Sequence, residues 1–408
     1  MSERSQTNRW LTILGIGEDG VEGLSPNARN ALASAECVIG GRRHLKLLDE
    51  HISGERLPWP KPFSDAVGWV RQRQGRAVVV LASGDPFEYG VATQLAESFS
   101  PQEMLCIPSP SAFSLACSRL GWTRHKTKTL SFCGRPIAPL VRALQPGQRI
   151  LALSADAVTP AEVAQCLRDR GFGRSPFYVL ECIGGARERI TRTVAADFVG
   201  LEVQPLNVIG IEVLADSGAQ IIPLACGLDD ALFEHDGQIT KREIRAITLS
   251  ALAPRAGELL WDIGCGSGSV AIEWLMRHDE SKAIAIEANK ERAQRTVRNA
   301  LALGTPDLVV VEGEAPQAFA NLPAPDAIFI GGGAHVLGLI EQAWDALRPG
   351  GRLVANAVVI ETEAALLEGQ RKFGGMLSRL SIERLDSIGR FHSFRHAMTV
   401  TQWRTEKS

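Results

Sequence analysis

The chain has 408 residues, of which 45% are hydrophobic and 22% are charged, and its formal net charge is −2. This length and composition predict a globular protein of two or three domains, and the charge argues against general attraction to a phosphate backbone. The eight cysteines form no C-x-x-C pair, so no zinc site and no disulfide framework are indicated. Because no run reaches the ~18 apolar residues of a membrane span and the N-terminus lacks an apolar signal core, we expect a soluble, cytoplasmic protein without a membrane partner. On the charge, we expect no nucleic-acid partner either.

The first strand candidate, at 10–16, runs into a literal G-x-G-x-x-G from Gly15 to Gly20. In the dinucleotide-binding fold the helix begins within such a loop. Here the helix signals, Ser25 as N-cap and Pro26 at the first helical position, come five residues later. The spacing therefore argues against a nicotinamide site at this loop.

A strand buried on both faces is predicted at 77–82, because this stretch is a continuous apolar run. It leads into Ser83-Gly84-Asp85-Pro86, and the strand candidates at 104–107 and 129–132 also end in small, Gly, Pro or Ser residues. Ligands of open α/β sheets bind at the carboxyl ends of strands. Alternating helix and strand signals continue to residue 213, so this half is predicted to form two α/β lobes with a cleft between them.

Residues 10–215 resemble the tetrapyrrole (corrin/porphyrin) methylase family. The matching segments are Gly15-Ile-Gly17, Ser83-Gly84-Asp85-Pro86 with Tyr89-Gly90, Pro110-Ser111-Ala112 and Gly134-Arg135-Pro136. The resemblance implies that S-adenosylmethionine (SAM) lies in the cleft, with Gly84, Asp85, Ser111 and Ala112 as cofactor-binding residues. Two positions depart from the family pattern: the run at 108–111 contains Ser109, and Cys133 stands where His is common, so no acid/base histidine is expected there.

The stretch 258–275 predicts a strand, a glycine loop and a helix. The apolar run 259–261 meets Asp262, and glycines follow at 264, 266 and 268 before helical spacing restarts. Such glycines let backbone N–H groups approach a ligand, and the helix N-terminus adds a positive dipole end. The third glycine comes four residues after the first, not five, which argues against a dehydrogenase. Glu287, 19 residues past Gly268, is placed to accept ribose hydroxyls.

These elements look like the first two motifs of class I SAM methyltransferases. The resemblance assigns cofactor binding to Asp262, Gly264, Cys265, Gly266, Ser267, Gly268 and Glu287, with the adenine beside Gly313, Glu314 and Ala315. Thr240 and Glu243 predict a capping box for a helix through residue 252. The resemblance to the C15-methylating family given in the next paragraph implies that Thr240 also touches SAM, and the two interpretations can coexist. Strand candidates at 308–312, 327–330, 352–359, 376–385 and 397–403 complete a seven-stranded Rossmann-like sheet.

Residues 230–408 as a whole resemble the C15-methylating, decarboxylating domain of cobalamin (vitamin B12) biosynthesis, and the full chain resembles the family of fused precorrin C5,15-methyltransferases (decarboxylating). The resemblance implies an α/β protein with a tetrapyrrole methylase domain at 1–215, a linker at 216–235 and a class I SAM-dependent methyltransferase domain at 236–408. It also implies two SAM sites, a precorrin substrate, methylation at carbons 5 and 15, and loss of CO₂ from the C12 acetate. We further expect a homo-oligomer.

The implied chemistry needs positioning more than a strong nucleophile, because carbons of a reduced tetrapyrrole attack the sulfonium methyl directly. No catalytic residue is assigned. Candidate acids for the decarboxylation are His335, His392 and His396, each with a structural role as the competing hypothesis. Candidate cations for the substrate's carboxylates are Arg42, Arg43, Arg135, Arg390 and Arg395.

Other functions stay open. One is a class I methyltransferase of another small molecule or RNA with a non-catalytic N-terminal domain, and another is a SAM-binding regulatory module, from which only turnover separates an enzyme. An RNA or DNA amino-methyltransferase would carry an Asn/Asp-Pro-Pro-aromatic motif at the fourth strand, which the segment starting at Asp326 lacks.

Overall fold

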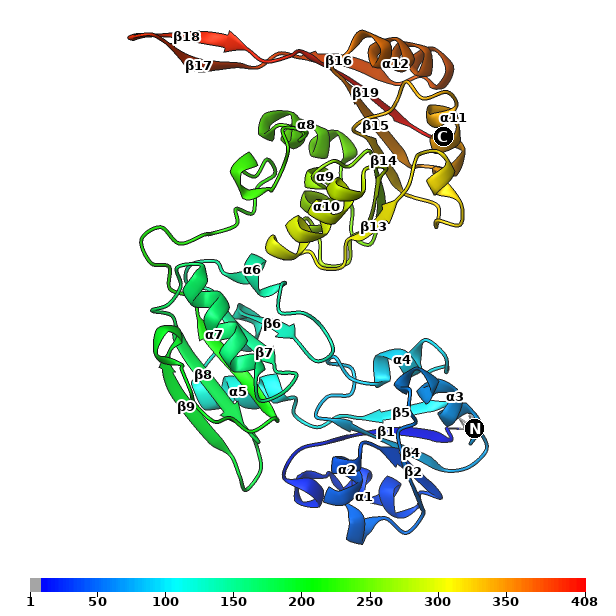
Figure 1. Ribbon diagram of the computed structural model, residues 1–408. Coiled ribbons are helices and arrows are strands. Elements are labelled where there is room, and N and C mark those ends of the chain that lie inside the picture. Colours follow the sequence, from blue (N-terminus) through cyan, green and yellow to red (C-terminus); the bar gives the residue numbers. More distant parts are fainter. Residues whose placement is uncertain (1–8) are drawn as a thin grey trace, which may run out of the picture. The chain divides into compact units, whose positions relative to one another are not determined.

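The computed structural model describes residues 9–408 (Figure 1). Its contacts divide the chain into two compact units. Unit 1 comprises Met1–Ile137 and Gln145–Gln220, and unit 2 comprises Ala138–Leu144 and Ile221–Ser408. Residues 1–8, on which the expected absence of a signal core partly rests, lie outside the described residues. Within 9–408, no helix combines the length and the apolar character needed to cross a bilayer.

The first sheet of unit 1 consists of five parallel strands in the order β3-β2-β4-β1-β5. The strands are β1 (Leu11–Ile16), β2 (Cys37–Gly40), β3 (Glu55–Pro58), β4 (Val78–Ser83) and β5 (Met104–Ile107). The helices of this part are α1 (Pro26–Ala33), α2 (Arg42–Leu47), α3 (Ala66–Arg71) and α4 (Ala92–Ala96). Because the strands are parallel, the segments that follow them all begin at one edge of the sheet.

The second sheet of unit 1 has the order β6-β7-β10-β8-β9, and only β6 and β7 are parallel among its neighbours. Its strands are β6 (Thr127–Ser131), β7 (Arg149–Leu153), β8 (Pro176–Glu181), β9 (Arg189–Val194) and β10 (Asn207–Glu212). Helices α5 (Ala112–Leu120) and α7 (Thr159–Asp169) belong to the same part of the unit. Phe113 of α5 is buried in one apolar cluster with Leu151 and Leu180 of the sheet, which fixes the start of α5 against it.

Unit 2 contains a seven-stranded sheet in the order β13-β12-β11-β14-β15-β19-β16, in which β19 runs in the opposite direction to the other strands. Its strands are β11 (Leu259–Ile263), β12 (Lys282–Glu287), β13 (Val309–Glu312), β14 (Ala327–Ile330), β15 (Arg352–Ala357), β16 (Met376–Leu380) and β19 (Val400–Glu406). The helices are α6 (Leu140–Ala143), α8 (Arg242–Leu252), α9 (Ser269–Leu275), α10 (Lys290–Ala302), α11 (Leu339–Ala346) and α12 (Ile360–Phe373). The sheet buries Trp261 and Trp403 in its core.

The α/β class predicted from the sequence is confirmed, and one predicted element is wrong. The single strand expected at 376–385 is divided: β16 ends at Leu380, and β17 (Glu383–Ile388) pairs with β18 (Phe391–His396) in a separate two-stranded hairpin. The hairpin extends away from the rest of unit 2 (Figure 1). Its side chains are mostly exposed on both faces, so no alternation of buried and exposed positions marks its strands in the sequence.

Candidate active sites

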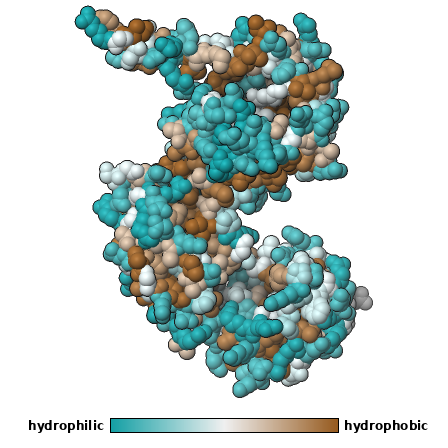
Figure 2. All heavy atoms as spheres, viewed as in Figure 1, coloured by the Kyte–Doolittle hydropathy of each residue, from teal (hydrophilic) through white to brown (hydrophobic). Residues whose placement is uncertain are grey.

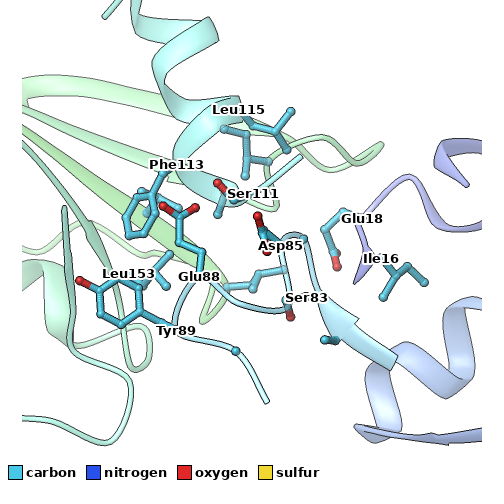
Figure 3. Close-up of a pocket in the computed structure, with 18 of the residues that line it drawn as sticks. Ile16, Glu18, Ser83, Asp85, Glu88, Tyr89, Ser111, Phe113, Leu115 and Leu153 are labelled. Carbon is cyan, nitrogen blue, oxygen red and sulfur yellow. The ribbon is translucent and has the colours of Figure 1, made fainter. Parts of the chain in front are cut away.

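Unit 1 holds a cavity of ≈ 330 Å³ between its two sheets. One wall consists of the segments that follow β1 and β4 together with the start of α5, and the facing wall includes Leu153, Leu180 and Val208 of the second sheet. Figure 3 shows Glu18, Ser83, Asp85 and Ser111 around this space. The cavity thus lies at the carboxyl ends of parallel strands, where ligands of open α/β sheets bind.

Gly15 packs β1 tightly against the turns that follow β4 and β5. A Cβ atom at this position would lie 1.9 Å from the carbonyl oxygen of Gly84 and 2.6 Å from the backbone nitrogen of Ser109. Ser109, one of the two departures from the family pattern, donates its hydroxyl to the Gly15 carbonyl at 2.8 Å. Helix α1 starts only at Pro26, with the Ser25 hydroxyl as its cap, so Gly15 serves strand packing and not a dinucleotide loop.

The four residues predicted to bind a cofactor in this unit, Gly84, Asp85, Ser111 and Ala112, all line the cavity. Gly84 has a φ of +54°, which favours glycine, and Asp85 accepts a hydrogen bond from the Phe87 backbone at 2.9 Å. Ser111 caps α5 by accepting from the Ser114 backbone at 3.2 Å, so the helix N-terminus faces the cavity. These residues are brought together; their role stays a prediction.

Glu18 and His44 also line this cavity and were missed by the sequence analysis. Glu18 follows β1, and His44 lies in α2, which follows β2. Burial and the neighbouring Arg43 charge lower the pKa of His44 to about 4. The signal that points to such residues is their position just after a buried parallel strand.

Unit 2 holds a larger cavity of ≈ 850 Å³ beside the glycine loop after β11. Gly264, Gly266 and Gly268 have φ values of +66°, +60° and +75°, which L side chains rarely adopt. A Cβ atom at Gly268 would also lie 2.5 Å from Thr296 Cγ2. The loop therefore requires glycine both for its backbone conformation and for its packing.

Two carboxylates hold this loop from different sides. Glu287, at the end of β12, accepts from the Gly266 backbone at 2.9 Å and from the Asn289 backbone at 3.0 Å. Asp262, at the end of β11, is buried and accepts from the Ala271 backbone at 3.0 Å. Burial raises the pKa of Asp262 to about 7, and the nearby charge of Glu287 adds to the shift.

Most residues predicted to bind a cofactor in unit 2 line its cavity: Thr240, Gly264, Cys265, Gly266, Glu287, Gly313, Glu314 and Ala315. Three others, Asp262, Ser267 and Gly268, are not among the lining residues. Asp262 and Ser267 are almost fully buried, so they are placed to shape the loop from behind.

The predicted capping box of Thr240 and Glu243 is wrong. Helix α8 begins at Arg242, its N-cap is Lys241, and no side chain caps it. The Thr240 carbonyl accepts a hydrogen bond from Arg245 Nη1, while Glu243 forms an ion pair with Arg384 of β17. The buried Arg245 thereby holds the segment before α8 in place of a cap.

The predicted acids and cations are dispersed. His335 is exposed with Nδ1 3.5 Å from Thr362 Oγ1, and β18 carries His392, Arg395 and His396. Within residues 9–408, none of these three histidines lines either cavity. Of the five predicted arginines, Arg43 lines the unit 1 cavity, whereas Arg42, Arg135, Arg390 and Arg395 line neither.

Comparisons with known proteins identify the class. Residues 11–199 match the family model of Tetrapyrrole (Corrin/Porphyrin) Methylases, and residues 231–407 match that of the Precorrin methyltransferase domain. The chain is therefore an enzyme of the precorrin methyltransferase class, with two such domains. It is 52% identical over 402 residues to the Precorrin-6Y C(5,15)-methyltransferase [decarboxylating] of Sinorhizobium sp, covering 98% of this chain and 97% of that one. The chain belongs to the precorrin-6Y C(5,15)-methyltransferase (decarboxylating) family, which confirms the resemblance found in the sequence.

Two further relatives are informative. The protein of the same name from Mycobacterium tuberculosis is 39% identical over 401 residues, covering 97% of this chain and 100% of that one. The Probable cobalt-precorrin-6B C(15)-methyltransferase (decarboxylating) of Saccharolobus solfataricus is 36% identical over 154 residues, covering 36% of this chain and 77% of that one. A relative named for C15 methylation and decarboxylation alone thus matches about one third of the chain.

Proposed function

We propose that the chain is a bifunctional SAM-dependent C-methyltransferase of cobalamin biosynthesis that methylates carbons 5 and 15 of a precorrin and decarboxylates its C12 acetate. The observation that carries the proposal is the presence of two cavities, one in each unit, each formed at strand ends with glycines in left-handed conformation. Two methyl groups and two cofactor sites on one chain are consistent with each other. Methylation at C5 is assigned to unit 1, and methylation at C15 with decarboxylation to unit 2.

Unit 2 is proposed to have the Rossmann-like class I methyltransferase fold. Its sheet supports this assignment, because five parallel strands are extended by the antiparallel β19 and by β16 at the edge. We propose domain boundaries at 1–215, 216–235 and 236–408, supported by the separate family matches and by the boundary between the units after Gln220.

SAM fits the residues present in both units. In unit 2, the Glu287 carboxylate lies beside the glycine loop, where it can meet ribose hydroxyls, and the backbone of Gly313 to Ala315 lines the space assigned to adenine. In unit 1, the Gly84 turn and the α5 N-terminus border the cavity. When bound, SAM supplies an electrophilic methyl group.

The residues of the chain act mainly by positioning and by excluding water. Apolar side chains at Leu115, Leu153 and Val208 wall the unit 1 cavity, and the buried Ile263, Ile286 and Leu339 do so in unit 2. Such walls keep an electron-rich ring carbon unsolvated and in line with a methyl donor. They also favour loss of CO₂ from a carboxylate held in a poorly solvated place.

The test combines binding and product analysis. Calorimetry on the intact chain should show two SAM sites, and incubation with the precorrin and SAM should yield a product heavier by two methyl groups and lighter by one CO₂. SAM binding without any mass change of the precorrin would contradict the enzyme and support a regulatory module. Transfer of one methyl group only would contradict the bifunctional assignment.

We also propose that the protein is a homo-oligomer and that the β17–β18 hairpin contributes to its interface. Leu385, Ile388, Phe391 and Phe394 are more than half exposed on this hairpin, and Figure 2 shows apolar and polar side chains side by side on it. An isolated two-stranded hairpin is marginally stable in water, so a second copy that covers these side chains would stabilise it. Sedimentation analysis of a Phe391→Ser, Phe394→Ser double variant should show a smaller mass than the wild type; an unchanged mass would contradict this role.

A further inference from the structure

The unit 1 cavity presents little positive charge to a polycarboxylate substrate. Its lining includes the carboxylates of Glu18, Asp85 and Glu88. Among the described residues that line it, Arg43 is the one with an arginine or lysine side chain. A tetrapyrrole with several carboxylates that enters this cavity therefore meets a single cation on its walls.

Two other arginines lie near the cavity but do not line it. Arg124 forms an ion pair with Glu88, and its guanidinium lies 5.5 Å from the centre of the Phe113 ring. The Arg135 guanidinium lies 5.6 Å from the centre of the Tyr89 ring. Arg124 therefore balances the charge of Glu88. Arg135 packs on Tyr89, which lines the cavity, but Arg135 itself does not line it.

Arg43 is held by residues that follow three neighbouring strands. It lies in α2, after β2, and forms an ion pair with Glu18, which follows β1. Its Nη2 donates to His44 Nε2 at 2.8 Å and to the hydroxyl of Ser83, at the end of β4, at 3.2 Å. The Arg43 side chain is 38% exposed and that of Glu18 only 11%, so the carboxylate is the more enclosed partner.

His44 orients Arg43 without cancelling its charge. A guanidinium offers only donors, so His44 Nε2 must accept, and the imidazole is neutral with its proton on Nδ1. Burial and the Arg43 charge lower the pKa of His44 to about 4, which keeps the ring neutral near pH 7. The Ser83 hydroxyl lies 3.0 Å from His44 Nε2 and so contacts both His44 and Arg43.

We propose that Arg43 binds a carboxylate side chain of the tetrapyrrole in the unit 1 cavity, and that Glu18, His44 and Ser83 position its guanidinium for this contact. The inference rests on the function proposed for unit 1. Nη2 donates to both His44 and Ser83 and Nη1 pairs with Glu18, so Nε–H and the second N–H of Nη1 remain to donate to a carboxylate. Three fixed partners reduce the entropy lost when such a contact forms.

The test compares Arg43→Gln with Arg42→Gln, the adjacent exposed arginine that does not line the cavity. C5 and C15 methylation are followed separately by mass and fragment analysis. For Arg43→Gln we expect the KM of C5 methylation for the precorrin to rise about tenfold or more, since a charge-assisted hydrogen bond is lost. C15 methylation and SAM affinity by calorimetry should stay as in the wild type, and Arg42→Gln should change none of these values.

A second pair of variants tests the positioning role of His44. The Gln side chain in His44→Gln can place an acceptor near the position of Nε2, whereas the shorter Asn side chain in His44→Asn cannot. We expect the first variant to keep the wild-type KM within about threefold and the second to raise it about as much as Arg43→Gln does. Equal thermal unfolding of the two variants would exclude a fold defect as the cause.

A stable probe gives an independent readout. Uroporphyrin, which carries eight carboxylates, should bind the wild type more tightly than Arg43→Gln in a fluorescence titration, and its octamethyl ester should not distinguish them. Unchanged C5 kinetics in Arg43→Gln, or an equal loss of SAM affinity, would overturn the inference while the proposed function stands. A wild type that transfers no methyl to C5 would overturn the function proposed for unit 1, and this inference with it.

Discussion

Single residues set the properties of both cavities, and Asp262 has the clearest electrostatic consequence. Its carboxyl group is buried, and burial raises its pKa to about 7 from an ordinary value of 3.8. Between these two pH values the folded protein holds a proton that the unfolded chain has lost. Stability therefore falls as the pH rises from about 4 to about 7.

We expect Asp262→Asn to remove this fall, which can reach about 4 kcal/mol for a three-unit shift. The amide oxygen of Asn can still accept from the Ala271 backbone, so the loop keeps that contact. Urea unfolding monitored by tryptophan fluorescence between pH 4.5 and 8 measures the effect. Asp307→Asn, at an exposed position, is the control and should keep the wild-type slope. An equal slope in Asp262→Asn would show that Asp262 is not the titrating group.

Gly15 is the residue on which the packing of the first sheet depends most directly. A Cβ atom there would overlap the Gly84 carbonyl, and the obstacle is backbone that cannot rotate away. We expect Gly15→Ala to destabilise unit 1 by about 1–3 kcal/mol or more and to abolish SAM binding by unit 1. Gly68→Ala is a suitable control because its Cβ would meet no atom within 4 Å. Calorimetry showing two intact SAM sites in Gly15→Ala would contradict the prediction.

Among the elements, α8 and α9 are joined by a buried ion pair that also anchors the segment before α8. Arg245 Nε donates to Glu273 at 2.6 Å, and both side chains are fully buried. Glu273 also accepts from the backbones of Gly227 and Leu228 at 2.7 and 2.9 Å. One carboxylate thus satisfies three donors. Its removal would leave two backbone N–H groups without an acceptor and the buried Arg245 with the partly exposed Asp230 as its carboxylate partner.

We expect Glu273→Ala to lower the stability of unit 2 by about 3–5 kcal/mol, because one partner of a buried pair is lost while the other stays buried. Glu341→Ala breaks the exposed pair with Lys372, 3.1 Å long, and should cost less than about 1 kcal/mol. Urea unfolding of both variants gives the comparison. Similar losses of unfolding free energy in Glu273→Ala and Glu341→Ala would contradict the prediction that the buried pair stabilises the protein more than the exposed one.

At the scale of the whole molecule, each of the two compact units holds a cavity of its own, so we expect the two proposed cofactor sites to act independently. We expect Gly268→Ala to eliminate SAM binding by unit 2, because the added Cβ would lie 2.5 Å from Thr296 Cγ2 in a backbone conformation that favours glycine. Calorimetry should then show one site instead of two, and product analysis should show the C5 methyl alone. Loss of both methylations in this variant would indicate coupling between the units.

Much of this protein could be predicted from the sequence because its signals are local. Strands buried on both faces, such as β4 and β11, are continuous apolar runs, and the strand-glycine-helix sequence at 258–275 is contiguous. The family, the α/β class and most strands followed from such stretches. The glycine loop could be placed without knowledge of its neighbours, since the backbone conformation that demands glycine is a property of the loop itself.

Only the tertiary structure decided which distant residues meet. Glu18, Arg43 and Ser83 come together because β1, β2 and β4 are parallel neighbours, and no sequence signal states that order. The Thr240 capping box failed for a related reason: Arg245, fixed by the buried Glu273, takes the Thr240 carbonyl. Local patterns determine which elements form, whereas the order of strands and the burial of charges depend on packing between segments far apart in the chain.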